Sequence, residues 1–488
     1  MSELYIIGPI ILIAVVLAAV WLDRWSVPVI LVALCAGILF GSDVLNLVHF
    51  DDMDLTNRIA NMALIFILFQ GGFGTKRDDF RAVALPAGGM ATWGVVLTAA
   101  VTFVVLYGLL GWSLDKAILL AVIISSTDAA ATFSILRRQS LPNRLSSTLE
   151  IESAANDPMA ILLTVVAVTG LTSGQTQWHT IVASFFWKFM MAPLIGWSLA
   201  RGAIWLFNQI SPQDRGHYYV LSLGIILLVY GTAELFKASG MLAVFIAGYV
   251  LGNHPFVHKQ GVANFTAAIS TIANIGMFAL MGLLVFPNQW ANLWVEGVVL
   301  FLVLTFVSRP IAVWIGLWGI RMHIKHKLFI MWAGLRGAVP IILGTYPAAA
   351  KMAVGIDVFN LVFFAVLLSI AVQGSTLGLV AKWLGLSRPK RPKPLFCLEL
   401  ITMTPSDYDL VVVDLPGPKG TPGPQIKDLA LPPGAIITLI ARGKEAIAPK
   451  GATRLEGWDQ VTVLTHAAAE EEVRKSLLDG FRGVGGTA

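Results

Sequence analysis

The chain has 488 residues, of which 56% are hydrophobic and only 13% are charged, whereas soluble domains carry roughly 25% charged residues. This composition excludes an ordinary soluble protein and predicts an integral membrane protein. The net charge of +5 does not imply nucleic-acid binding, because the basic residues cluster in short loops. Cys35 and Cys397 are the two cysteines, and they predict neither a disulfide framework nor a zinc site.

A series of apolar segments runs along the chain. The first begins without a preceding basic region or a small-residue cleavage site, so we expect a retained helix and not a signal peptide. A helix needs roughly 17–25 residues to cross a bilayer. The predicted spans are 4–22, 27–46, 57–74, 83–111, 115–137, 149–171, 178–208, 216–236, 239–253, 263–286, 292–320, 326–350 and 356–384. We therefore expect about 13 transmembrane helices, of which 239–253 is short.

The charges of the loops predict the orientation of the chain. Loops after odd-numbered helices are basic, as at 76–81, 137–144 and 388–393, and loops after even-numbered helices are acidic or neutral. Lys351 is a mild exception. Because cytoplasmic loops carry the excess of Lys and Arg, we expect the N-terminus outside and the C-terminus in the cytoplasm.

The composition changes after residue 388. Residues 1–388 form the predicted transmembrane domain, and 389–395 are a basic, Pro-rich linker. Strand-like runs at 396–403, 407–415, 435–443 and 459–465 precede a helical run at 467–481. We expect a small cytoplasmic α/β domain over 396–482 and a disordered tail over 483–488.

Acidic residues stand at the start of the apolar run that follows residue 150. Ionisable groups at bilayer depth are costly and usually mark a transport pathway. On a helix, Ser153 and Asp157 are neighbours one turn apart, as are Glu152 and Asn156. A plain helix start with Pro158 in its first turn would also place acids here, and for Glu152 that alternative stays open. For Asp157, with apolar residues directly after it, we favour a functional role.

Two other apolar segments carry signs of interruption. Thr127 and Asp128 follow two serines in one segment, and Gly334, Arg336 and Gly337 interrupt another. Broken helices in corresponding positions of two halves indicate a transporter site. The two interrupted segments are the fifth and twelfth predicted helices. They occupy corresponding positions if helices 8–13 are an inverted repeat of helices 1–6. A satisfied hydrogen bond between helices is the alternative explanation for Asp128.

An arginine lies deep in the eleventh predicted helix. A buried guanidinium needs a carboxylate partner, and Glu152 is the first candidate for Arg309. We interpret Glu152 and Arg309 as a structural ion pair, with Asp157 as the competing partner.

Together these residues resemble a known family. The motifs are STD at 126–128, ESAAND at 152–157, SRP at 308–310, GLRGAVP at 334–340 and QGSTL at 373–377. They resemble the cation:proton antiporter superfamily, in its Asn-Asp branch of sodium/proton and potassium/proton exchangers. The tail resembles the C-terminal half of the regulator-of-potassium-conductance (RCK C-terminal) domain. This pairing is similar to bacterial potassium/proton antiporters linked to pH and cell-volume homeostasis.

The resemblance implies a fold and an ion site. The fold is an all-α polytopic membrane protein with inverted repeats and two broken crossing helices, followed by the α/β domain. Thr127, Asp128, Ser153, Asn156 and Asp157 would surround the monovalent cation, held at Asp157 and Asp128. Asp157 would be the exchanged carboxylate. The resemblance further assigns Glu152 and Arg309 to a stabilising pair, and places Gly334, Arg336 and Gly337 in broken helix 12.

The implied activity is electroneutral antiport, one potassium or sodium ion for one proton, by alternating access. The chain would then be no enzyme, need no cofactor and bind no nucleic acid. It would lie among lipids of the bacterial inner membrane, as a homodimer whose tail binds a small cytoplasmic ligand. Two departures from the family pattern stand out. Gln70 replaces the acid usual in the third helix, and the tail lacks a GxGxxG motif, so NAD binding is not implied.

Other functions are less well supported by the sequence. An ion channel would agree with the tail, but a TVGYG-type filter is absent. The eight histidines form no metal-ligand pattern of the kind a membrane enzyme would need. An organic-solute transporter stays open, although the polar set is small. Oxygen ligands serve potassium and sodium alike, so the sequence leaves the choice between them open.

Overall fold

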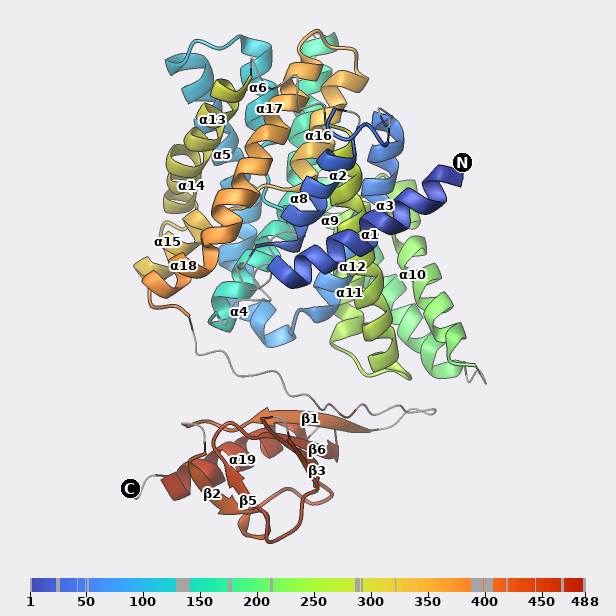
Figure 1. Ribbon diagram of the computed structural model, residues 1–488, viewed down its shortest axis with the longest axis vertical. Helices are drawn as coiled ribbons and strands as arrows, with labels where there is room; N and C mark the ends of the chain where they lie inside the picture. The colour runs from blue at the N-terminus through green and yellow to red at the C-terminus, as the bar shows by residue number, and fades with distance from the viewer. Residues whose placement is uncertain are drawn as a thin grey trace. The chain divides into compact units, whose positions relative to one another are not determined.

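The computed structural model (Figure 1) divides into two compact units. It describes residues 2–22, 27–41, 43–48, 50, 52–128, 141–173, 178–210, 214–285, 290, 293–320, 322–387, 398, 407–417, 420–443, 445–466 and 469–485. The smaller unit contains the region beyond residue 388, together with Trp205–Tyr218 and Phe256–Val262. The predicted linker at 389–395 and the strand at 396–403 lie outside the described residues, apart from residue 398.

The larger unit is a bundle of helices. In its first half these are α1 (Ser2–Leu22), α2 (Val29–Phe40), α3 (Met53–Gly74), α4 (Arg77–Gly89), η2 (Met90–Gly94), α5 (Val95–Phe103), η3 (Val104–Leu109), α6 (Leu114–Ile123), α8 (Asn143–Ser173) and α9 (Trp178–Gln209). In its second half they are α10 (Gly216–Leu235), α11 (Gly240–Gly252), α12 (Lys259–Leu283), α13 (Trp294–Val303), η5 (Leu304–Ser308), α14 (Arg309–Gly316), α15 (Ile324–Trp332), α16 (Ala338–Ala349), α17 (Gly355–Leu368), η6 (Ser369–Gly374) and α18 (Ser375–Trp383).

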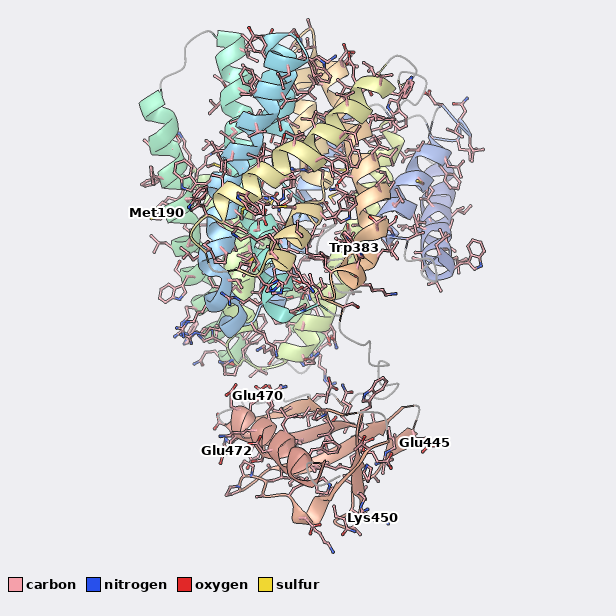
Figure 2. The ribbon with its side chains drawn as sticks, turned by 90° about the vertical axis from the view of Figure 1, so that its left-hand side faces the viewer. Met190, Trp383, Glu445, Lys450, Glu470 and Glu472 are labelled. Atoms are coloured by element: carbon pink, nitrogen blue, oxygen red, sulfur yellow. The ribbon has the colours of Figure 1, made fainter. Side chains whose placement is uncertain are left out.

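Many of these helices have the length and composition of membrane spans. Within the described residues, seven are long and apolar enough to cross a membrane, and four more are apolar but shorter. Each of the thirteen predicted ranges contains helix, although the number of spans stays a prediction. Large apolar side chains lie on the outside of the bundle, such as Met190 on α9 and Trp383 on α18, which are 64% and 86% exposed (Figure 2). Such a surface suits lipid and not water.

Glycines bring α3 and α11 into close contact. A Cβ atom at Gly72 would overlap the backbone of Phe245, and one at Gly248 or Gly252 would overlap the backbone of α3. Small residues allow helix backbones to approach closely, which is how membrane helices gain packing energy without a hydrophobic driving force. This α3–α11 pair is therefore a tightly packed part of the bundle.

The C-terminal region forms a small α/β fold. Its strands are β1 (Tyr408–Asp414), β2 (Pro422–Gln425), β3 (Ile436–Arg442), β4 (Glu445–Ile447), β5 (Arg454–Glu456) and β6 (Gln460–His466). One antiparallel sheet has the order β1-β6-β3-β4, and β2 pairs with β5 in a second sheet. Buried residues of β1, β3 and β6 pack with Val473, Leu477 and Phe481 of α19 (Glu470–Gly485) in one hydrophobic core.

The last helix of this region extends past the predicted domain boundary at residue 482, because α19 continues to Gly485. Its last three residues extend a strongly amphipathic helix whose apolar side already packs in the core. Residues 486–488 lie outside the described residues.

Candidate functional site

The end of one helix and the interruption of another meet in the centre of the bundle. The first, α6, ends at Ile123, and the described chain then runs without helix to Asp128. The second is interrupted between Trp332, where α15 ends, and Ala338, where α16 begins. The backbone N–H of Asp128 donates a hydrogen bond of 3.0 Å to the carbonyl oxygen of Leu335. The two segments in which the sequence predicts interruptions therefore lie side by side, and the continuation of the first, at 129–140, lies outside the described residues.

Charged side chains satisfy the helix ends that the interruptions expose. The Asp128 carboxylate accepts a hydrogen bond of 3.1 Å from the N–H of Ala338, at the start of α16. Nη1 of Arg336 donates to the carbonyl oxygens of Ser125 and Ser126, at 2.7 and 2.6 Å, just beyond the end of α6. A negative charge at a helix N-terminus and a positive charge at a helix C-terminus both interact favourably with the helix dipole. Asp128 thus has a structural contact as well as its predicted place near the ion.

Gly337 is required by this close approach. A Cβ atom there would overlap the Asp128 carboxylate. The alternative that we set against a transport role, a satisfied hydrogen bond for Asp128, is therefore present. It does not exclude the transport role, because a carboxylate has two oxygens and several lone pairs.

The long helix α8 carries the predicted ion ligands beside this crossing. Asp157, Asn156 and Ser153 are each no more than 2% exposed. The side-chain amide of Asn156 donates to the Thr127 hydroxyl at 2.6 Å, and that hydroxyl lies 2.9 Å from the Ser153 hydroxyl. Residues predicted from separate motifs are thus joined in one buried polar cluster.

Several oxygens in this region have no hydrogen-bond partner among the described residues. They include both carboxylate oxygens of Asp157, the amide oxygen of Asn156 and the hydroxyl of Ser126. Burying a carboxylate without a partner is costly, since nothing replaces the water that it loses. A proton or a cation bound at Asp157 would remove that cost. Sequence reasoning did not find Thr164, whose buried hydroxyl also lacks a partner two turns further along α8.

The predicted ion pair joins α8 to the neighbouring helix α14. Nη1 of Arg309 lies 2.6 Å from Oε1 of Glu152, and both side chains are at most 4% exposed. Arg309 also donates to the carbonyl oxygen of Ile330, at 3.4 Å. Arg309 is therefore paired with Glu152, and Asp157 has no such charged partner among the described residues.

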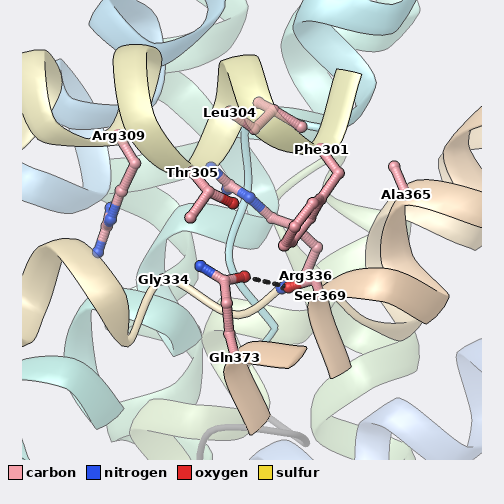
Figure 3. Close-up of a pocket in the computed structure, with 9 residues that line it drawn as sticks. All are labelled: Phe301, Leu304, Thr305, Arg309, Gly334, Arg336, Ala365, Ser369 and Gln373. Carbon is pink, nitrogen blue, oxygen red and sulfur yellow. Dashed lines mark hydrogen bonds between the residues drawn. The ribbon is translucent and has the colours of Figure 1, made fainter. Parts of the chain in front are cut away.

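Figure 3 shows Arg309 and Arg336 around a small cavity, beside residues of α13, η5, α17 and η6. Its volume is about 10 Å³, roughly the space of a single water molecule. Ser369 accepts from the N–H of Arg336 at 3.1 Å and donates to Gln373 at 2.6 Å. The QGSTL motif contains Gln373, so the sequence signalled this position, whereas Ser369 carried no signal of its own.

Gln70, which departs from the family pattern, holds two helices together. Its side-chain oxygen accepts a hydrogen bond of 2.7 Å from the Thr266 hydroxyl, which joins α3 to α12. An amide neither binds nor releases a proton at physiological pH. Gln70 therefore has a structural contact.

Known proteins resemble the chain in sequence and in fold. Residues 10–383 match the family described as "Sodium/hydrogen exchanger, transmembrane". The K+/H+ antiporter NhaP2 of Shewanella oneidensis is 34% identical over 95% of this chain and 81% of its own length. The K+/H+ antiporter NhaP of Alkalimonas amylolytica is 32% identical over 97% of this chain and 82% of its own length.

A sodium antiporter and a solved structure extend the comparison. The Na+/H+ antiporter NhaH of Halobacillus dabanensis is 29% identical over 61% of this chain and 76% of its own length. The sodium proton antiporter MjNhaP1 of Methanocaldococcus jannaschii covers 78% of this chain and 99% of its own, with a TM-score of 0.65 and 22% identity. That likeness extends the agreement to the fold. With a family match over most of its length and relatives above 30% identity, the chain belongs to the transmembrane sodium/hydrogen exchanger family.

Proposed function

We propose that the protein exchanges one monovalent cation for one proton across a membrane, with Asp157 as the carboxylate that binds both. Membership of the exchanger family and the antiporter relatives support the exchange itself. One observation carries the role of Asp157. This carboxyl is 1% exposed, and neither of its oxygens has a hydrogen-bond partner among the described residues. The site is thus favourable only when a proton or a cation occupies it.

Competition for one carboxylate couples the two movements. A proton and a cation each leave the loaded site neutral, whereas the empty site carries a charge that is costly to move through a low-dielectric region. The loaded forms therefore cross and the empty form does not. The exchange then carries no net charge.

Thr127, Ser153, Asn156 and Asp128 complete the proposed site. The Asn156 amide oxygen has no partner among the residues that the structure describes, and Asn156 directly precedes Asp157 in the chain. This oxygen is therefore a suitable neutral ligand for a cation. The hydroxyls of Thr127 and Ser153 orient the Asn156 side chain through their hydrogen bonds. Asp128 acts mainly through its contact with α16, because one of its oxygens already accepts the Ala338 N–H.

Potassium is the proposed cation. Relatives at 34% and 32% identity are K+/H+ antiporters and align over nearly the whole chain. The Na+/H+ relative is 29% identical and aligns over 61% of it. The oxygen ligands themselves do not distinguish the two ions, so sodium is the second candidate.

Alternating access would move the crossed helices, with α8, against the tightly packed α3–α11 pair. The ion pair between Glu152 and Arg309 would keep α8 attached to α14 during that movement. A homodimer in a bacterial inner membrane, with the N-terminus outside and a regulatory cytoplasmic tail, completes the proposal. The basic loops support this orientation.

Cation-dependent proton flux in inverted membrane vesicles tests the proposal. Potassium, sodium, rubidium and lithium are added in turn to vesicles with a preformed pH gradient. We expect potassium to dissipate the gradient most effectively, without a change in membrane potential. A flux that needs no added cation, or one that generates a potential, would contradict electroneutral exchange.

A further inference from the structure

A second pocket lies away from the ion site, between α4, α9 and α11. Its volume is about 360 Å³. The lining residues are Arg77, Phe80, Arg81, Trp197, Tyr249, Val250, Asn253 and His254. Among the side chains that the structure describes, the lining contains no acidic residue.

Two arginines supply the positive charge of this pocket. Arg77 and Arg81 are one helical turn apart at the start of α4, so they project to the same side of the helix. Both side chains are exposed, and neither has a carboxylate within ion-pair distance among the side chains that the structure describes. Two guanidiniums on one face form a site suited to a phosphate group, which they can bind through several charged hydrogen bonds.

The pocket also has an apolar and aromatic part. The rings of Phe80 and Tyr249 lie 4.8 Å apart, which joins α4 to α11, and Val250 lies beside them. Trp197 on α9 is 55% exposed. Tryptophan and tyrosine are enriched where a protein meets the polar region of a membrane. A ligand that fills this pocket would therefore have an anionic group at one end and a hydrocarbon part at the other.

Asn253 gives the pocket a defined shape. Its side-chain oxygen accepts the N–H of Arg77 at 2.8 Å, and its amide donates to the carbonyl oxygen of Thr75 at 2.8 Å. The side chain at the end of α11 thereby holds the turn from α3 into α4. These hydrogen bonds fix the backbone at the start of α4, from which the two arginine side chains project.

From these observations we propose that the pocket binds one anionic phospholipid, with its phosphate at Arg77 and Arg81 and an acyl chain along Trp197 and Val250. The amphipathic lining favours a lipid over a soluble phosphate compound. The helix α4 packs along α8, which carries Asp157, and α11 packs mainly on α3 and to a lesser extent on α8. A lipid bound at this site bridges both groups of helices and so stabilises their arrangement. The site requires only this geometry and is independent of which cation is exchanged.

The test compares lipid binding by matched variants of the full chain. The purified protein is delipidated in detergent and titrated with phosphatidylglycerol, phosphatidylcholine or inorganic phosphate. Thermal melting and native mass spectrometry are the two readouts. The double variant Arg77→Gln, Arg81→Gln removes the proposed phosphate ligands. The double variant Arg215→Gln, Lys382→Gln removes two positive charges outside the pocket and serves as the control.

We expect phosphatidylglycerol to raise the melting temperature of the wild type and of the control, with one lipid retained per chain. Phosphatidylcholine should have at least a tenfold weaker effect, and the pocket variant should lose both responses to phosphatidylglycerol. Equal responses of the two double variants would overturn the proposal, since general surface charge would then explain binding. Stabilisation by inorganic phosphate alone would also overturn it, in favour of a soluble ligand. A pocket variant that melts as the wild type does in the absence of lipid confirms that it is folded.

Discussion

The buried ion pair between Glu152 and Arg309 leads to the sharpest prediction about stability. Breaking a buried pair by removing one partner costs roughly 3–5 kcal/mol, because the other charge is left without compensation. Both side chains are at most 4% exposed, and the two charged atoms lie 2.6 Å apart. We therefore expect Glu152→Gln and Arg309→Gln each to destabilise the protein by an amount in that range.

The structure also predicts which variant is worse. Arg336 lies close enough to interact electrostatically with both members of the pair, and it lines the same cavity as Arg309. Glu152→Gln leaves the guanidiniums of Arg309 and Arg336 close together without the carboxylate of Glu152. Arg309→Gln leaves Glu152 with Arg336 nearby. The first change should consequently cost more than the second, and the double variant should cost less than the sum.

Thermal melting of the four proteins in one detergent forms a double-mutant cycle that measures this coupling. Size-exclusion chromatography checks that each variant is assembled. Additive losses in melting temperature would show that the two residues are not energetic partners. A larger loss for Arg309→Gln would refute the role assigned to Arg336.

Four other changes test the site and the tail. Asp157→Asn should abolish cation-dependent proton flux in vesicles while the protein stays assembled, because an amide cannot exchange a proton, and flux near that of the wild type would remove Asp157 from its role. Asp128→Asn keeps an oxygen that can accept the Ala338 N–H but removes the charge, so we expect a lower apparent cation affinity with exchange retained; unchanged affinity and rate would leave Asp128 with its structural contact alone. Gly337→Ala should lower the melting temperature strongly, since the new methyl group would overlap Asp128, whereas Gly276→Ala on α12 meets no atom within 4 Å and should be tolerated. Truncation after Leu386 should leave an assembled exchanger with an altered pH profile of transport, and an identical profile would assign the tail to assembly and not to regulation.

The amino-acid sequence by itself determined the class of protein and the places where its chemistry lies. Long apolar runs report on the membrane because the bilayer accepts few unpaired polar groups. For the same reason, a carboxylate inside such a run, as at Asp157, is informative without any structure. The Gly and Pro residues around Arg336 likewise predicted an interrupted helix, because these residues weaken helices locally.

Only the tertiary structure decided which residues interact with each other. The sequence left Arg309 with two candidate carboxylates. The packing of α8 against its neighbours brings Glu152 to Arg309, and Asp157 has no hydrogen-bond partner in the part of the chain that the structure describes. The pocket with Arg77 and Arg81 had no sequence signal beyond a basic loop, since its other wall comes from α9 and α11. Local sequence determines the cost of burying a group, but the group that offsets this cost comes from a distant segment. Only the fold brings the two together.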